Sequence, residues 1–218
     1  MKNLIVLGGS GIGMIAISIA KDLGCYTIGG FLNDVEPVGT FIGKYDKFPV
    51  IGTTNDLPNF LVDENNVFFI AYVGMQHEEE VFKKITSLNI PCNRFATLIH
   101  PSAVIPKGMC EIGNGVLLSP LCQLSPDTKI EDNCILLGNC FIGHDTTIKR
   151  FAHVASNAVV GANVSIGYAC HVGTNSVIRE KTIIGDFCLI GSGSVVLNDV
   201  EDHSIVVGNP AKLLRKTV

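Results

Sequence analysis

An aliphatic residue recurs at every sixth position through the second half of the chain, and this period limits the possible folds more than any other feature. The series runs unbroken from Ile112 to Val196 and contains only Leu, Ile or Val. A six-residue period fits neither the 3.6-residue turn of an α-helix nor a simple array of hairpins. Its members are Ile112, Leu118, Leu124, Ile130, Leu136, Ile142, Ile148, Val154, Val160, Ile166, Val172, Ile178, Ile184, Ile190 and Val196.

A second series lies four residues after each member of the first, and its residues are small or β-branched. It contains five of the eight cysteines, at positions 122, 134, 140, 170 and 188. Because a buried free cysteine behaves as a compact hydrophobic residue, these five are predicted to fill a core instead of forming disulfides. No C-x-x-C pair occurs, which disfavours a zinc ribbon.

The period of six is typical of a parallel β-helix built from hexapeptides, in which each short strand places one aliphatic residue on the axis. With three strands per coil, neighbours in adjacent coils are 18 residues apart, and the series makes about five coils. Glycine directly follows the aliphatic position at 113, 143, 161, 167, 173, 185 and 191. We predict that these glycines form corners that need unusual backbone angles.

Residues 112–197 resemble the left-handed β-helix of the hexapeptide acyltransferases. The ending VVGNPAKLLRK, residues 206–216, is similar to the V-G-x-P-A-K close of that superfamily. The resemblance implies a homotrimer that binds acetyl-CoA in the cleft between neighbouring coils. A three-sided prism with flat faces suits such an assembly.

The first hundred residues follow a different pattern, in which a buried strand leads into a glycine-rich loop and an amphipathic helix. A strand, this loop, the helix and a second strand ending in Asn33-Asp34 form a nucleotide-binding βαβ pattern. The loop lacks the G-x-G-x-x-G spacing, so a nicotinamide cofactor is disfavoured, and a merely tight turn remains an equal alternative. The expected segments are strand 4–7, loop 8–13, helix 14–24, strand 26–31, strand 67–72 and helix 77–88.

Together the two halves resemble the bacterial nucleotide-sugar N-acetyltransferases and sialic acid O-acetyltransferases. The resemblance implies a Rossmann-like nucleotide-sugar-binding domain over residues 1–97 and a left-handed β-helix acetyltransferase domain over 98–218. Ile12 stands where many relatives have histidine, and Asn33 replaces the first residue of an acidic pair. The positions implied to contact the nucleotide-sugar are Ser10, Gly11, Ile12, Asn33, Asp34 and Gly74.

His144 is the candidate general base. Acetyl transfer needs a group that takes the proton from the attacking amine or hydroxyl, and histidine suits this task near neutral pH. His144 lies off the aliphatic position and Asp145 follows it. A solvated corner histidine is the alternative that the residues alone allow. The family has Gly-His-Asp or Gly-His-Glu here, which implies that His144 is the base and that Asp145 assists it.

His153 and His171 occupy the same slot one coil apart, so we expect their side chains to stack. His153 matches a family histidine that contacts acetyl-CoA or the substrate, whereas His171 has no such match. Resemblance also implies that Thr174, Gly191 and Ser192 meet the pantetheine arm of acetyl-CoA, although relatives often carry glycine where Ser192 stands. The remaining histidines, at 77, 100 and 203, are predicted to be structural.

Composition narrows the class of protein. A net charge of −4 and no Lys/Arg cluster longer than two disfavour nucleic-acid binding. No apolar run approaches the roughly 20 residues that a membrane helix needs, and the first residues lack a signal-peptide core, so we expect a cytoplasmic protein without membrane insertion.

The sequence thus predicts an acetyl-CoA-dependent N-acetyltransferase acting on a nucleotide-linked amino-deoxy sugar for cell-surface glycan or glycoprotein biosynthesis. UDP is the expected nucleotide and acetyl-CoA is the expected co-substrate. The enzyme is expected to need no metal. A sialic acid O-acetyltransferase is a close alternative. A non-catalytic sugar-binding scaffold and a zinc-dependent β-helix enzyme of the γ-carbonic-anhydrase kind are alternatives of other classes. The zinc enzyme needs three histidine ligands, and the spacing of 144, 153 and 171 is unlike the pattern expected for it.

Overall fold

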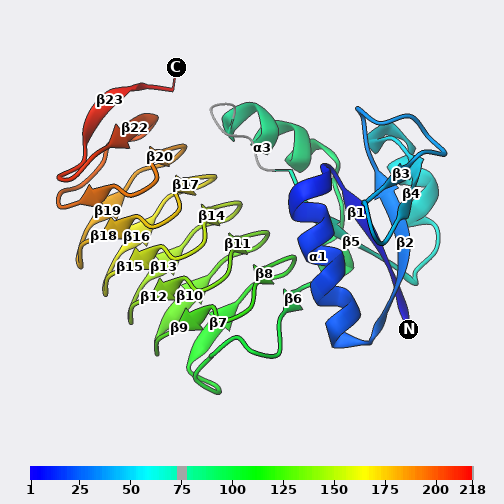
Figure 1. Ribbon diagram of the computed structural model, residues 1–218, viewed down its shortest axis with the longest axis horizontal. Helices are drawn as coiled ribbons and strands as arrows, with labels where there is room; N and C mark the ends of the chain where they lie inside the picture. Colours follow the sequence, from blue (N-terminus) through cyan, green and yellow to red (C-terminus); the bar gives the residue numbers. More distant parts are fainter. Residues whose placement is uncertain (73–77, 218) are drawn as a thin grey trace.

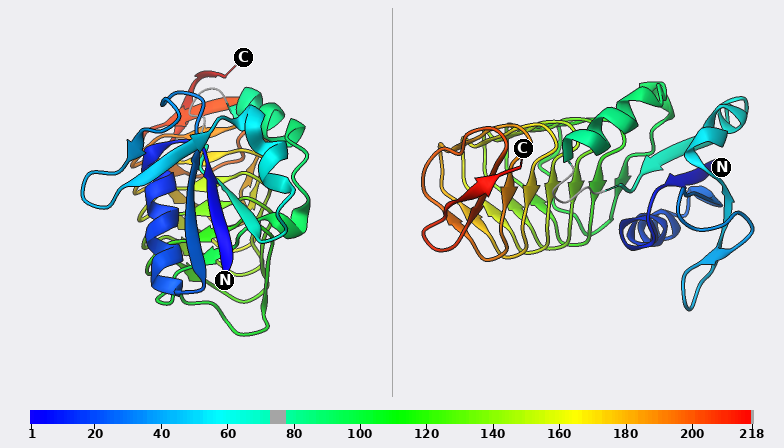
Figure 2. Two further views of the ribbon diagram at one scale, coloured as in Figure 1. Left: turned by 90° about the vertical axis from the view of Figure 1, so that its right-hand side faces the viewer. Right: turned by 90° about the horizontal axis from the view of Figure 1, so that it is seen from above.

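A computed structural model describes residues 1–72 and 78–217 of the chain. The N-terminal part is an α/β domain with one β-sheet. The rest of the chain winds into a prism of short parallel strands that ends in the C-terminal hairpin (Figure 1). Figure 2 shows the sheet and its helices seated against one end and one side of the prism, with the C-terminus at the opposite end. No helix in the described ranges is long and apolar enough to cross a bilayer.

The N-terminal sheet has the strand order β3-β4-β2-β1-β5, in which only β3 is antiparallel to its neighbour. The predicted strands are present with small shifts at their ends. The predicted loop 8–13 is wrong over residues 10–13, because α1 begins at Ser10 instead of at residue 14. His77, the expected start of the second helix, lies outside the described residues, and β3, β4 and α2 were not predicted. The elements are β1 (Lys2–Leu7), α1 (Ser10–Leu23), β2 (Tyr26–Leu32), β3 (Phe41–Ile42), β4 (Phe48–Gly52), a 3-10 turn (Thr54–Asp56), α2 (Leu57–Leu61), β5 (Asn66–Ile70), α3 (Glu78–Ser87) and a second 3-10 turn (Cys92–Arg94).

Helix α1 packs closely on the sheet because Gly13 has no side chain. A Cβ at Gly13 would lie 2.6 Å from Cε1 of Phe31 on β2. The apolar face of α1, including Ile17 and Ala20, is buried against this sheet. The helix ends at Gly24, whose φ of 66° permits the left-handed cap. Close packing holds the N-terminus of α1 at the carboxyl edge of the sheet, where ligands bind in α/β folds.

The prism is a parallel β-helix with three faces, and it confirms the predicted coil. Residues paired across neighbouring coils are 18 apart, as in Ile135 with His153 and Phe141 with Val159. We name each face after one of its strands. The β7 face has β7 (Cys110–Ile112), β10 (Thr128–Ile130), β13 (Thr147–Ile148), β16 (Ser165–Ile166) and β19 (Ile183–Ile184).

The other two faces complete the prism. The β9 face contains β9 (Gln123–Leu124), β12 (Phe141–Ile142), β15 (Val159–Val160), β18 (Val177–Ile178) and β21 (Val195–Val196). The β8 face is the longest, because it gains a strand from the junction and a hairpin at the C-terminus. It contains β6 (Leu98–Ile99), β8 (Leu117–Leu118), β11 (Ile135–Leu136), β14 (His153–Val154), β17 (His171–Val172), β20 (Leu189–Ile190), β22 (Ser204–Val207) and β23 (Lys212–Lys216).

Both sequence series line the interior of the prism. Every aliphatic position from Leu118 to Val196 is at most 2% exposed, and only Ile112, in the first coil, is partly exposed. The five cysteines of the second series are buried in the same core and are free thiols, which confirms their predicted role. Cys122 and Cys140 lie in adjacent coils with their Sγ atoms 3.2 Å apart.

The glycines that follow the aliphatic positions serve a different purpose from the one predicted. None of the seven has a positive φ. Instead, a Cβ added at any of them would lie 2.2 to 2.8 Å from an atom of the neighbouring coil, such as the backbone nitrogen of Glu180 for Gly161. The prediction of unusual angles at these glycines was therefore wrong, because the requirement is for close approach between coils.

The left-handed backbone conformation occurs two residues further along each corner. Thirteen corner residues, repeating every six positions, have φ between 50° and 68°. Asparagine and aspartate dominate this set, and both tolerate this conformation better than most residues. The set is Leu121, Asp127, Asn133, Asn139, Asp145, Phe151, Asn157, Asn163, Ala169, Asn175, Lys181, Phe187 and Gly193.

The β8 face joins the β-helix to the N-terminal sheet. Strand β6 pairs with β8, and the outward side chains Leu117 and Ile135 belong to the same buried cluster as Phe69 of β5. Helix α3 reaches further along the prism, where Phe82 contacts the rings of Phe151 and Phe187 edge-to-face at 5.2 and 5.9 Å. The boundary at residues 97 and 98 remains a prediction.

Candidate active site

His144 and Asp145 lie at an exposed corner between β12 and β13. Nδ1 of His144 is 2.6 Å from Oδ2 of Asp145, and both side chains are more than half exposed. Asp145 is one of the left-handed corner residues, with a φ of 57°. A carboxylate that accepts the Nδ1 hydrogen leaves Nε2 as the proton acceptor and stabilises the imidazolium once it forms. The corner therefore has the chemistry of a general base open to solvent.

His153 and His171 pair across β14 and β17, so they are neighbours in adjacent coils as predicted, but their rings do not stack. Their rings meet edge-to-face with centroids 4.6 Å apart, and their Nδ1 atoms are 3.0 Å apart. His153 is only 8% exposed and its Nε2 has no hydrogen-bond partner. Both rings line a small cavity that Tyr72 and Phe82 close from the N-terminal side. Contact between His153 and acetyl-CoA remains a prediction.

This pair should make the protein less stable in mild acid. Burial lowers the pKa of His153 to about 3, with a contribution from His171, and burial also lowers the pKa of His171. Between about pH 6.5 and 3 the unfolded chain therefore binds more protons than the folded chain, so stability falls as pH falls. Burial of His153 alone predicts a loss of about 2 kcal/mol in unfolding free energy from pH 7 to pH 5.

Urea titrations of the wild type and of His153→Leu at several pH values check this expectation. The variant should lose less stability than the wild type over the same interval, because it has no imidazole to protonate at this place. Parallel stability curves for the two proteins would mean that the buried pair does not titrate as inferred.

The three residues predicted to meet the pantetheine arm of acetyl-CoA lie at another corner, between the β8 and β9 faces. Thr174 and Ser192 are exposed and Gly191 is partly exposed. The backbone carbonyl of Thr174 accepts a hydrogen bond from Gly193 at 2.8 Å, so the two coils are in register there. In the coils that precede Thr174, the same corner contains Pro120, Gly138 and Ser156, which form one wall of a groove of about 440 Å³.

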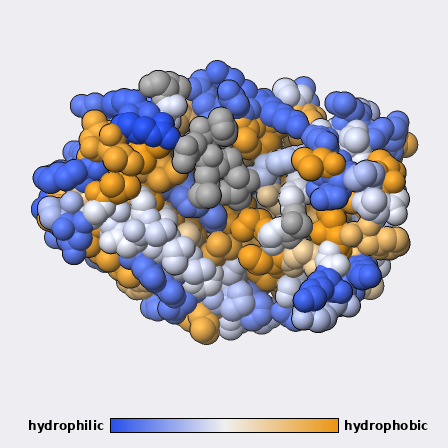
Figure 3. Space-filling view, turned by 45° about the horizontal axis from the view of Figure 1, so that its top comes forward, coloured by the Kyte–Doolittle hydropathy of each residue, from blue (hydrophilic) through white to orange (hydrophobic). Residues whose placement is uncertain are grey.

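The opposite wall of that groove is α1. Met14, Ile15 and Ile19 line it, together with Asp22 and His100. The lining is largely apolar, and the groove lies between the N-terminal domain and the corner that carries Thr174 and Ser192. The groove reaches Ser156, one coil before Thr174, and neither Thr174 nor Ser192 lines it. Figure 3 shows another aspect of the molecule, on which apolar side chains gather in several patches. Among the exposed apolar residues are Leu213 and Leu214 of the C-terminal strand β23.

The glycine-rich loop lies at the carboxyl edge of the N-terminal sheet. Helix α1 begins at Ser10, and a Cβ added at Gly9 or Gly11 would meet no heavy atom within 4 Å. The backbone amides of the first turn are therefore approachable by an anion. Ile12 packs partly against the core beneath the loop. Gly74, also predicted to contact the nucleotide-sugar, lies outside the described residues.

Asn33 is a structural residue of this edge. It is 5% exposed, its Nδ2 donates to the carbonyl of Gly8 at 2.9 Å, and its Oδ1 accepts from the backbone amides of Val35 and Glu36. These bonds fix the loop after β2 against the glycine loop. A direct contact from Asn33 to a nucleotide-sugar remains a prediction.

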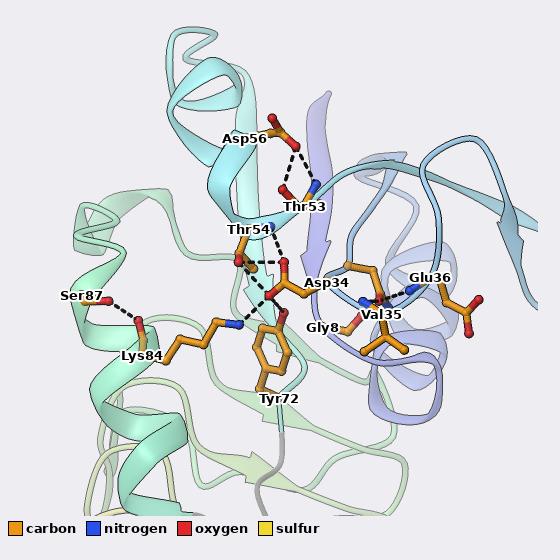
Figure 4. A network of polar contacts seen from close by, with 11 residues as sticks. Gly8, Asp34, Val35, Glu36, Thr53, Thr54, Asp56, Tyr72, Lys84 and Ser87 are labelled. Carbon is orange, nitrogen blue, oxygen red and sulfur yellow. Dashed lines mark hydrogen bonds and ion pairs between the residues drawn. The ribbon is translucent and has the colours of Figure 1, made fainter.

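Asp34 is engaged by donors from three other segments (Figure 4). Its carboxylate accepts from the amide and hydroxyl of Thr54, from the hydroxyl of Tyr72 at 3.2 Å and from Nζ of Lys84 at 2.5 Å. Partial burial would raise the pKa of Asp34, but hydrogen bonds from Lys84 and Thr54 outweigh it and lower the pKa to about 2. Burial and the Asp34 charge raise the pKa of Tyr72.

Two comparisons with known proteins find similar proteins. Residues 3–85 match the PglD N-terminal domain family. The acetyltransferase domain of PglB from Neisseria gonorrhoeae FA1090 is 29% identical, superposes with a TM-score of 0.84, and the match covers 98% of this chain and 100% of that one. The chain is an acyltransferase of the left-handed β-helix type. This confirms the family resemblance seen in the sequence. Among curated proteins, no sequence matches the chain significantly.

Two further solved structures of similar fold contain ligands. The same PglB domain in complex with acetyl coenzyme A is 28% identical with a TM-score of 0.80, over 98% of this chain and 99% of that one. PerB from Caulobacter crescentus, in complex with CoA and GDP-perosamine, is 22% identical with a TM-score of 0.84, over 99% of this chain and 98% of that one. At that identity the PerB likeness shows the fold alone.

Within one chain, the residues predicted to take part in acetyl transfer lie in separate places. His144 lies at one corner of the β9 face, Thr174 and Ser192 lie at the opposite corner, and His153 is buried on the β8 face.

Sequence reasoning missed Thr54, Tyr72 and Lys84, which surround Asp34. Tyr72 and Thr54 lie just after the ends of strands, and this position could have indicated that they belong to the site. No motif marks Lys84. Within residues 1–72 and 78–217 no group of three or more His, Cys, Asp or Glu side chains could hold a metal ion.

Proposed function

We propose that this acyltransferase moves the acetyl group of acetyl-CoA to the amino group of a nucleotide-linked amino-deoxy sugar, for glycan or glycoprotein sugar biosynthesis. The observation that carries the proposal is the near full-length match to the PglB acetyltransferase domain, which has been solved in complex with acetyl coenzyme A. The family match over residues 3–85 supports a Rossmann-like sugar-nucleotide domain in front of the β-helix. UDP is the nucleotide we expect.

In the proposed reaction His144 is the general base. The amine lone pair attacks the thioester carbonyl carbon while Nε2 of His144 takes a proton from the nitrogen. The tetrahedral intermediate collapses, the carbon–sulfur bond breaks, and the imidazolium returns the proton to the CoA thiolate. Asp145, hydrogen-bonded to Nδ1 at 2.6 Å, stabilises the imidazolium in between. The products are the N-acetylated sugar and free CoA.

The separation of the predicted residues supports a site shared between the subunits of a homotrimer. Phe141, Val159, Val177 and Val195 form an outward column on the β9 face, and Val159 and Val177 are 40% and 38% exposed. Burying this column against a second copy would bring the His144 corner of one chain towards the Thr174 corner of another.

A thiol-release assay tests the proposal. The purified protein is given acetyl-CoA and a panel of UDP-, GDP- and dTDP-linked amino sugars, with free sialic acids in a separate arm. We expect CoA release with one nucleotide-linked amino sugar and a product heavier by one acetyl group that resists mild alkali, as an amide does. Release only with a sialic acid, and an alkali-labile ester, would replace the proposal by O-acetylation. No turnover with any acceptor would favour a binding scaffold.

A further inference from the structure

The carboxyl edge of the N-terminal sheet holds one lysine that no sequence motif indicated. Asp34 follows β2, Thr54 follows β4 and Tyr72 follows β5, so three strand ends contribute to one polar cluster. Strand β1 lies between β2 and β5, and it leads into Gly8 and the glycine loop. A Cβ at Gly8 would lie 3.1 Å from Cγ of Tyr72, so the cluster adjoins the loop directly. Lys84 is the cation of this cluster.

The Asp34 carboxylate has little capacity left for a ligand. An ionised carboxylate offers about four acceptor sites. The amide of Thr54, its hydroxyl, the hydroxyl of Tyr72 and the ammonium of Lys84 already donate to it. The direct contact to a nucleotide-sugar that resemblance assigns to Asp34 would therefore have to displace a protein donor.

Lys84, in contrast, still has hydrogen-bond donors available for a ligand. Its ammonium carries three hydrogens, one of which goes to Asp34, and its side chain is 49% exposed. Nζ lies 5.4 Å from the centroid of the Tyr72 ring, so the ring and the carboxylate together fix its place. Figure 4 shows Lys84 extending from α3 to the point where Asp34, Thr54 and Tyr72 meet.

Helix α3 holds the lysine from the other side. Phe82, two residues earlier, packs on Phe151 and Phe187 at the corners of the β-helix, and Ile85 is buried. Since α3 is fixed by these contacts, Lys84 is set at the ligand edge before any ligand arrives. A cation fixed beforehand loses little side-chain freedom on binding an anion.

We infer that Lys84 binds the diphosphate of the nucleotide-sugar and that Asp34 is the positioning residue that holds it there. The inference rests on the proposed function and refines it, because it moves the ligand contact from the acid to the lysine. Asp34 then acts through Lys84, and Tyr72 supports both. The ligand class is a nucleoside diphosphate, whose phosphate oxygens accept hydrogen bonds from the two remaining N–H groups.

Calorimetric titration of UDP, GDP and dTDP, each compared with its nucleoside, tests this inference. For the diphosphate that binds the wild type best, Lys84→Met should weaken binding about tenfold and leave nucleoside binding unchanged. Lys84→Arg should retain most of the affinity, and Asp34→Asn should lose about threefold because the lysine is no longer held. Lys83→Met is the matched control, since Lys83 pairs only with Glu79 on the same helix in the contacts described and should bind like the wild type.

The outcomes separate the two proposals. If the wild type binds one of the diphosphates and Lys84→Met binds it equally well, the role of Lys84 is overturned and the proposed function stands. If the wild type binds none of the three diphosphates, both fail. An equal loss for nucleoside and diphosphate would also overturn the inference, because it would indicate a general distortion of the site. Melting temperatures of all variants establish that each is folded.

Discussion

The variant His144→Ala is expected to lower kcat for acetyl transfer on the order of 10²-fold or more, with the subunit assembly unchanged. His144 is exposed at its corner and belongs to no core cluster, so its removal should not disturb folding. The loss should appear in kcat, because the imidazole accepts its proton only as the amine attacks. Steady-state thiol release under saturating substrates and size-exclusion chromatography measure the two parts of this expectation.

Glu180→Ala is the matched control for this variant. Glu180 occupies the equivalent corner position two coils further along the prism and is also exposed. It has no role in the proposed reaction, so its kcat should equal that of the wild type. Asp145→Asn should give a smaller loss than His144→Ala, since the base would remain but its imidazolium would be less stabilised. Turnover by His144→Ala within a few-fold of the wild type would disprove the assignment of the base.

A second large effect is expected from the core of the prism. Leu136→Ala should lower the free energy of unfolding by about 2–5 kcal/mol, the usual cost of a buried Leu-to-Ala change. Leu136 is completely buried on the axis, between Leu118 and Val154 of the coils on either side. Each coil contacts only its neighbours, so a cavity in one coil weakens the two interfaces that it makes.

Chemical denaturation of Leu136→Ala beside Leu121→Ala measures this effect. Leu121 is 61% exposed at a corner, and its truncation should change stability by no more than about 0.5 kcal/mol. A loss for Leu136→Ala as small as that for the corner leucine would contradict the view that the six-residue series forms the core.

The β-helix could be predicted because its core repeats in the sequence. An uninterrupted aliphatic period cannot be satisfied by another regular fold, and the cysteines of the second series follow from the same packing. The glycine prediction failed because the sequence cannot distinguish two reasons for lacking a side chain. At Gly161 the reason is the backbone of Glu180 in the next coil, and the unusual φ falls on Asn163 instead.

The N-terminal site was less predictable because it depends on contacts between distant segments. Lys84 reaches Asp34 across 50 residues, and nothing in the local sequence of α3 distinguishes it from Lys83. Strand β4 and helix α2 were missed because each has only five residues and no strong period. The bond between His144 and Asp145 forms at a corner where Asp145 has the left-handed backbone conformation, and neither the bond nor this conformation follows from the two residues alone.

A crystal structure of the protein with CoA and its nucleotide-linked amino sugar tests the central claim most directly. The account predicts that Nε2 of His144 lies within about 3 Å of the sugar amine, the reach of a hydrogen bond, with the CoA sulfur on the other side of that nitrogen. A His144 ring that contacts neither ligand in any subunit would contradict it.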